Sequence, residues 1–394
     1  MQRRLPVTVV TGFLGAGKTT LLRHLLTTSG LRLAVLVNEF GEVGIDGDLL
    51  RSCGFCPEEE LEGRLVELAN GCLCCTVQDD FLPTMQKLLA SADRLDGIVV
   101  ETSGLALPEP LVQAFQWPDI RTRTRVNGVV TVVDGEALAG GSVVADPSAL
   151  ERQRAADPSL DHLSDLEELF DDQLRAADLV LVSRADRLTP ADLDRVRERL
   201  QAVCRPGAQV LPMQRGQVPP ELLLGLDRPA GANSHHPQRE TSHDHQDDHD
   251  HDHDHQDDHD HDHHDHHDHG HHDHTHVPMQ SVAIQLDGSF DREALEATLL
   301  EQIQVQALLR LKGWLLQPGK RRPLQIQAVG PRLDCWYEDH SDRLAAPTAT
   351  DKGSPRSPSV GRLELVALGL RVDRSLLLQA LESSRLREAS ASRV

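Results

Sequence analysis

The sequence has few aromatic residues and no long apolar run. Phe, Trp and Tyr together make up 3% of its 394 residues. Proteins that bind RNA or single-stranded DNA by stacking bases on aromatic side chains need a larger share of these residues. No run of about 18 apolar residues occurs, which argues against a membrane-spanning helix. We therefore expect no nucleic-acid partner and no membrane partner.

Cysteine is also sparse, and its distribution is uneven. Three of the seven cysteines fall at Cys72, Cys74 and Cys75. This clustering favours metal or redox chemistry over a disulfide scaffold. The N-terminal residues 1–4 lead straight into an apolar strand pattern without an export signal, so we expect a cytoplasmic protein.

The negative charge is concentrated in one segment. The net charge is −22, and residues 243–276 hold 17 His, 13 Asp and no Lys or Arg, which leaves −9 for the rest. Imidazoles alternating with carboxylates suit Zn²⁺, Ni²⁺, Co²⁺ or Cu²⁺. We favour low-affinity metal capture or buffering by this segment, and a merely solubilising role is the alternative.

Apolar strand patterns and helical patterns alternate along the first half of the chain. The strand patterns cover 5–11, 33–37, 97–100, 128–133 and 179–183, and helical patterns include 19–26, 81–90 and 166–177. Short, continuously apolar strands between helices are typical of a parallel sheet that is buried on both faces. The predicted fold class is α/β, with a doubly wound, mostly parallel sheet in a domain at 1–226.

The sequence of the second half of the chain predicts a linker and a smaller α+β domain. Residues 227–278 are too polar to form a core, and we predict a disordered linker there. Domain 279–394 follows, with a flexible loop at 341–361. Its expected strands are 279–286, 311–316, 324–329 and 362–368, and its expected helices are 291–304 and 374–382.

A phosphate-binding motif follows the first predicted strand. Residues 12–19 read GFLGAGKT and satisfy G-x4-G-K-[ST]. In this motif backbone N–H groups surround phosphate oxygens at a helix N-terminus. Lys18 would reach the β- and γ-phosphates and Thr19 would bind Mg²⁺. The candidate nucleotide-binding residues here are Gly12, Gly15, Ala16, Gly17, Lys18, Thr19 and Thr20.

Two later strand ends supply further candidate residues. Glu101 ends an apolar strand and would hold Mg²⁺ through water, which makes it a catalytic candidate together with Lys18 and Thr19, and Gly104 would donate its N–H to the γ-phosphate. A simple capping acid is the alternative for Glu101.

Ser183, Arg184 and Asp186 form a weakened N-K-x-D pattern, with Asp186 accepting hydrogen bonds from the base, so we favour guanine over adenine.

The cysteine cluster is the second strong signal. Thiolates at Cys72, Cys74 and Cys75 can converge on one soft or borderline cation. Buried structural cysteines are the alternative, although three within four residues make it the weaker one. For Cys53 and Cys56 an auxiliary metal site, a redox pair and incidental loop cysteines all stay open.

Four motifs together resemble the CobW family of metal-linked P-loop GTPases. They are GFLGAGKTT at 12–20, VNEFGEVGIDG at 37–47, ELANGCLCCTVQDDF at 67–81 and ETSGLALPEP at 101–110. The resemblance extends to the C-terminal region. It implies a GTP-hydrolysing metallochaperone that delivers a divalent transition metal to a client metalloprotein. Co²⁺ for cobalamin biosynthesis is our first expectation for the metal, with a cobaltochelatase as the client.

The resemblance also assigns residues 38–46 to the switch I region. Glu39 and Glu42 there would add oxygen ligands or position Mg²⁺, and solvated loop charges are the alternative. No Gln or Arg can be assigned to water activation, so we expect slow intrinsic hydrolysis coupled to metal transfer. A homodimer that depends on GTP and metal is a further expectation. A zinc chaperone and a metal-storage protein with nucleotide-regulated release stay open as alternative functions.

Overall fold

The computed structural model describes residues 4–37, 65–67, 81–144, 146–148, 166–224, 279–320, 322–337 and 361–386. All of them belong to one compact unit made of residues 1–228 and 278–394. The predicted linker at 227–278 and all but the last residue of the predicted loop at 341–361 lie outside the described residues. No helix in the described part is long and apolar enough to cross a membrane.

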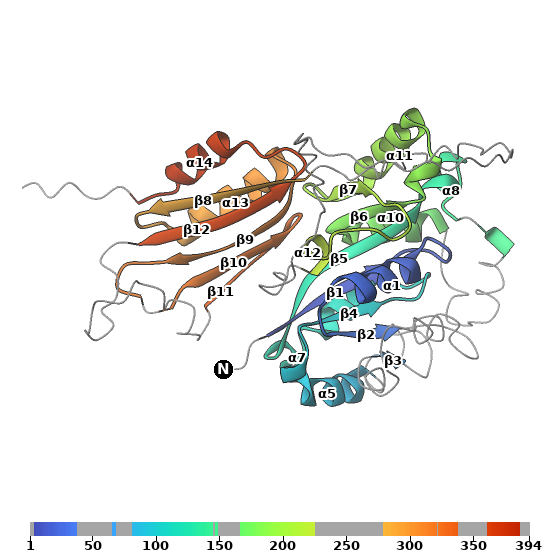
Figure 1. Cartoon of the computed structure of the whole chain (residues 1–394), viewed down its shortest axis with the longest axis horizontal. Coiled ribbons are helices and arrows are strands. Elements are labelled where there is room, and N and C mark those ends of the chain that lie inside the picture. The colour runs from blue at the N-terminus through green and yellow to red at the C-terminus, as the bar shows by residue number, and fades with distance from the viewer. Residues whose placement is uncertain are drawn as a thin grey trace, which may run out of the picture. The chain divides into compact units, whose positions relative to one another are not determined.

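The first sheet has seven strands, all paired in parallel, in the order β3-β2-β4-β1-β5-β6-β7 (Figure 1). A parallel sheet brings the carboxyl ends of its strands to one edge, where ligands bind in folds of this class. The strands are β1 (Leu5–Thr11), β2 (Leu33–Val37), β3 (Leu65–Glu67), β4 (Gly97–Glu101), β5 (Thr124–Asp134), β6 (Leu179–Ser183) and β7 (Gln209–Pro212).

Both faces of this sheet are buried under helices. Successive side chains of a strand point to opposite faces, so each strand contributes to both layers of the core. In β1, Val10 packs on one face, whereas Val7 and Val9 pack on the other. On the Val10 face lie α1 (Lys18–Thr28) and α12 (Pro220–Leu224). On the other lie α5 (Leu82–Ala90), α6 (Pro108–Ala114), α7 (Pro118–Arg121), α8 (Gly135–Ala139), α10 (Leu166–Ala176) and α11 (Pro190–Val203). The predicted doubly wound α/β fold is confirmed.

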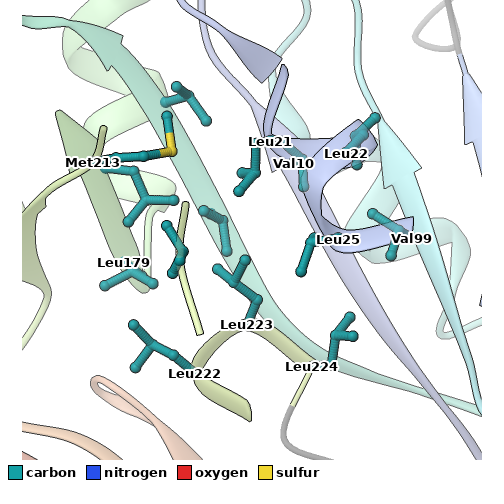
Figure 2. Close-up of a cluster of buried hydrophobic side chains, with 14 of the residues drawn as sticks. Val10, Leu21, Leu22, Leu25, Val99, Leu179, Met213, Leu222, Leu223 and Leu224 are labelled. Carbon is teal, nitrogen blue, oxygen red and sulfur yellow. The ribbon is translucent and has the colours of Figure 1, made fainter. Parts of the chain in front are cut away.

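The core beneath α1 holds the phosphate-loop helix in place. Leu21, Leu22 and Leu25 are at most 1% exposed and face Val10 and Val99 in the sheet (Figure 2). Leucines of α12 complete this cluster. Burying one such side chain contributes about 1.5–3 kcal/mol, so the start of α1 is anchored by its own apolar face.

The second sheet has five antiparallel strands in the order β11-β10-β9-β12-β8. Its strands are β8 (Gln280–Asp287), β9 (Leu308–Leu316), β10 (Leu324–Val329), β11 (Arg332–Tyr337) and β12 (Arg362–Gly369). Leu363 and Leu365 of β12 point inward to a core that α13 (Arg292–Val305) and α14 (Arg374–Ser383) cover. Asp291 caps α13 by accepting from Ala294 N–H. The predicted α+β character of this region is confirmed.

A buried carboxylate connects the two sheets at the start of β6. Asp178 is fully buried, and its Oδ2 accepts hydrogen bonds from Val129 N–H at 2.7 Å and from Arg332 Nε at 2.6 Å. Arg205 also pairs with this carboxylate. Arg332 begins β11 of the second sheet, so one acidic side chain ties β5, β6 and β11 together.

Replacing Asp178 by Ala should destabilise the fold by about 3–5 kcal/mol, because it leaves two partly buried arginines without their partner. Urea unfolding monitored by circular dichroism measures this loss. Asp172→Ala is the matched control: Asp172 is 42% exposed and pairs with Arg175 on the helix surface, a kind of pair worth about 0–1 kcal/mol. Equal effects of the two substitutions would contradict the structural role of Asp178.

Candidate functional site

The phosphate loop connects the end of β1 to the start of α1. Gly17 caps the helix with φ at 102°, and Gly12 has φ at 133°. A Cβ on Gly12 would lie 2.0 Å from the Val132 carbonyl oxygen of β5. Only glycine fits there, because the loop backbone rests directly on the neighbouring strand.

Lys18 and Glu101 meet at this edge of the sheet. Lys18 is 7% exposed, and its Nζ donates to the Gly12 carbonyl at 2.9 Å. The same Nζ lies 3.9 Å from Glu101 Oε1, at the end of β4. Thr102, the next residue, donates its hydroxyl to Thr11 at the end of β1. The structure thus brings together two of the three predicted catalytic residues, and Thr19 follows Lys18 in the first turn of α1.

Gly104 lies against the phosphate loop as well. The loop 102–106 after β4 is buried, and a Cβ on Gly104 would lie 2.7 Å from Leu14 N. This approach is backbone to backbone. The loop that follows Glu101 is therefore held at van der Waals distance from the residues that would surround a phosphate.

Two cavities lie along this edge and share Gly15, Gly17 and Thr20 in their linings. One has a volume of about 410 Å³ and includes Lys18, Thr19 and Arg23. The other has about 350 Å³ and includes the predicted base-reading residues Ser183, Arg184 and Asp186. Adjacent cavities of this size, one beside phosphate donors and one beside a carboxylate, fit a nucleotide.

Arg184 connects the base-reading loop to the phosphate loop. Its guanidinium pairs with Asp134 at the end of β5 and donates to the Gly15 carbonyl at 3.4 Å. Its φ of 53° is unusual for a residue with a side chain. Because the guanidinium is held by these partners, the aliphatic stem of Arg184 is the part available to lie along a purine.

Ser183, which takes the place of Asn in the N-K-x-D pattern, lies next to Gly17 of the phosphate loop. Its Cβ would be 3.6 Å from a Cβ placed on Gly17. The Ser183 hydroxyl is buried and has no hydrogen-bond partner in the described part of the chain. Among the described residues, the link from this loop to the phosphate-loop backbone is therefore made by Arg184.

The sequence did not predict two parts of this site, a turn after β7 and the acidic residue at the end of β5. Met213, Arg215 and Gly216 line the smaller cavity from a turn after β7, closed by a hydrogen bond from Gln217 N–H to the Gln214 carbonyl at 2.7 Å. No motif marks this turn. Asp134 is the other, and its signal was an acid at the end of an apolar strand, the same pattern that identified Glu101.

Comparison with known proteins identifies the family. Residues 6–212 match the family model described as CobW/HypB/UreG, nucleotide-binding domain, which is more than half of the chain. The chain belongs to the CobW/HypB/UreG family. Residues 279–385 match the model described as cobalamin synthesis protein cobW C-terminal domain. The resemblance seen in the four sequence motifs is confirmed, and so is the enzyme class that it implied, a P-loop GTPase.

Two relatives in this family align over most of the chain, and a third aligns over one third of it. A Pseudomonas aeruginosa protein named zinc chaperone CobW is 48% identical over 337 residues, 85% of this chain and 83% of its own length. A Sinorhizobium protein of the same name is 42% identical over 343 residues, 86% of this chain and 88% of its own length. The zinc-regulated GTPase metalloprotein activator 1 of Schizosaccharomyces pombe is 45% identical over 133 residues, 33% of this chain and 32% of its own length.

The predicted transition-metal ligands lie outside the described residues. These are Cys72, Cys74, Cys75 and the segment 243–276; the residues whose role stayed open, Glu39, Glu42, Cys53 and Cys56, lie outside them as well. The described part of the family fold contains no cluster of three or more His, Cys, Asp or Glu that could hold a metal ion.

Two cysteines do lie in the described part. Burial raises the pKa of the Cys204 thiol to about 11 and that of Cys335 to about 12. Either thiol therefore loses its proton less readily than an exposed cysteine, and metal coordination requires thiolates.

Substituting Arg184 by Ala should weaken GDP binding about tenfold or more, because it cuts the link between the two nucleotide loops and removes the ion-pair partner of the buried Asp134. Fluorescence titration with labelled GDP measures the change. Arg187→Ala serves as the control, since Arg187 lines the same cavity, is 63% exposed and pairs with Glu136. A loss for Arg187→Ala as large as that for Arg184→Ala would show that charge near the cavity matters and the link does not.

Proposed function

We propose that this chain is a GTP-driven metallochaperone: it binds a divalent transition metal at Cys72, Cys74 and Cys75 and transfers it to a client metalloprotein when GTP is hydrolysed. One observation carries the proposal. In the first sheet, Val37 at the end of β2 is the register partner of Glu67 at the end of β3. On its other side Val37 is the register partner of Glu101 at the end of β4.

This register supports a connection between the metal motif and the nucleotide. The GCLCC motif begins four residues after Glu67 in the sequence, with Gly71. The region assigned to switch I begins directly after Val37. Both segments therefore follow strands that end at the edge that carries the phosphate loop and Glu101. A segment ordered by the γ-phosphate could change the geometry of the thiolate site.

The geometry of the site supports the following roles at the nucleotide. Lys18 neutralises charge on the β- and γ-phosphates, and Gly104 donates its N–H to the γ-phosphate. Arg184 and Asp186 hold the guanine. The Thr19 hydroxyl and the buried Glu101 carboxylate, beside Lys18, are hard oxygen donors that suit Mg²⁺, with Glu101 acting through water. When bound, Mg²⁺ stabilises charge on the phosphates.

We propose Zn²⁺ as the metal cargo, since the two relatives that align over most of the chain are named zinc chaperones. Co²⁺ delivered to a cobaltochelatase is the second candidate, favoured by the cobalamin-synthesis description of the C-terminal model. Thiolate affinity alone does not select between these ions. The thiolate site needs reduced cysteines, the state that the cytoplasm maintains, so the cytoplasmic placement belongs to the proposal. The homodimer stays a prediction.

Mg²⁺ with a non-hydrolysable GTP analogue should tighten metal binding at least tenfold over Mg²⁺ with GDP. Competition with a chromophoric chelator measures this affinity. The triple substitution C72S, C74S and C75S should abolish the tight site and its nucleotide dependence, whereas Cys204→Ser should leave both unchanged because Cys204 belongs to no group of three or more possible metal ligands in the described part of the chain. Metal affinity that is indifferent to the nucleotide in the unsubstituted protein would contradict the proposed coupling.

Removing residues 243–276 should eliminate only weak metal sites, because their imidazoles and carboxylates are interchangeable ligands. Titration of Zn²⁺ and Co²⁺ into this deletion variant should retain one tight site per chain. The ion whose affinity responds more strongly to the GTP analogue is the cargo. Loss of the tight site on deletion would show that the His-rich segment, and not the cysteines, forms it.

A further inference from the structure

A buried glutamine contacts the loop that carries Gly104. Gln173 of α10 is 0% exposed, and its Nε2 donates to the Gly104 carbonyl at 3.1 Å and to the Ala106 carbonyl at 3.0 Å. With two carbonyls as partners, both N–H groups of the amide are used and its orientation is fixed. The loop 102–106 is buried and is neither strand nor helix. Its carbonyls therefore depend on such a donor.

The setting of Gln173 is otherwise apolar. It lies on the buried face of α10 with Leu169, Phe170 and Leu174. Its own Oε1 is buried and has no hydrogen-bond partner in the described part of the chain. A polar side chain that leaves one of its atoms unsatisfied in the core needs a reason, and the two bonds to the Gly104 loop supply one.

The same helix also contacts the phosphate loop. The rings of Phe170 and Phe13 have centroids 5.6 Å apart. The Gln173 backbone carbonyl accepts from the Thr131 hydroxyl of β5 at 3.2 Å. One turn of α10 thus fixes the phosphate loop through Phe170 and the Gly104 loop through Gln173, with β5 as the common support.

We propose that Gln173 is a positioning residue for GTP: by holding the carbonyls of Gly104 and Ala106 it keeps the Gly104 N–H aimed at the γ-phosphate, so that the protein distinguishes GTP from GDP and hydrolyses GTP. This inference rests on the proposed contact between Gly104 and the γ-phosphate. Gln173 touches no nucleotide itself and acts only through the loop.

Gln173→Met tests the role, because methionine keeps the volume but has no donor. Affinity for a non-hydrolysable GTP analogue should fall at least tenfold, and kcat for GTP should fall at least tenfold, while GDP affinity stays within twofold. Gln173→Glu should be worse, since a carboxylate repels both carbonyls. Gln302→Met is the matched control, because Gln302 is a buried helical glutamine, 5% exposed, in the second sheet's domain.

Hydrogen exchange provides a readout that does not depend on nucleotide. The Ala106 amide, bonded to the Ser103 carbonyl, should exchange faster in Gln173→Met. The Thr102 amide, bonded to the Val10 carbonyl, should be unchanged. If Gln173→Met does not fold, Gln173→Asn keeps the amide but is too short to hold both carbonyls, and the same pattern is expected.

Three results would overturn the proposal. They are a Gln173→Met protein with normal GTP-analogue affinity and normal kcat, an equal loss of GTP-analogue and GDP affinity, and unchanged exchange at Ala106. A failure of the proposed nucleotide contact would give a different result. If the unsubstituted protein binds both nucleotides equally, the γ-phosphate contact of Gly104 is wrong, and exchange at Ala106 still decides whether Gln173 holds the loop.

Discussion

The site depends on main chain packed directly against main chain at the carboxyl edge of the parallel sheet. Gly12 rests on the Val132 carbonyl and Gly104 rests on Leu14 N, at distances that leave no room for a Cβ. The residues that would surround a phosphate are therefore fixed by backbone geometry and by the core under α1. The charged pair Lys18 and Glu101 is held at 3.9 Å within that frame, and so it needs little rearrangement to meet a nucleotide.

Local patterns were enough to predict most of this frame. The apolar runs of β1, β2 and β6 have the predicted bounds, because buried parallel strands are continuously apolar. The phosphate loop is contiguous in sequence and was equally readable. The missed parts depend on long-range contacts: Arg184 pairs with Asp134 fifty residues earlier, and Gln173 bonds to a loop about seventy residues away. In β11 the sequence RLDCWY alternates only from Arg332 to Cys335 and none of its side chains is fully buried, so no apolar run marks this strand.

The strands that precede the predicted switch I region and the GCLCC motif end at the edge of the sheet that carries Glu101. β2 and β3 pair in parallel with each other, and β2 pairs with β4, so their carboxyl ends are level. Whatever follows these strands in the sequence starts beside Glu101. The proposed coupling of metal affinity to the nucleotide would therefore need no long pathway, because β2 and β3 end in register with β4, the strand that carries Glu101.

The central claim is that hydrolysis of GTP releases the metal. A single-turnover experiment tests it directly: the protein is loaded with Zn²⁺ and Mg-GTP, and phosphate release and free zinc are followed together with two fluorescent reporters. The account predicts that zinc appears at the rate of phosphate release, and that Lys18→Ala abolishes both signals. Zinc release that proceeds at the same rate without hydrolysis, or phosphate release with zinc retained, would contradict it.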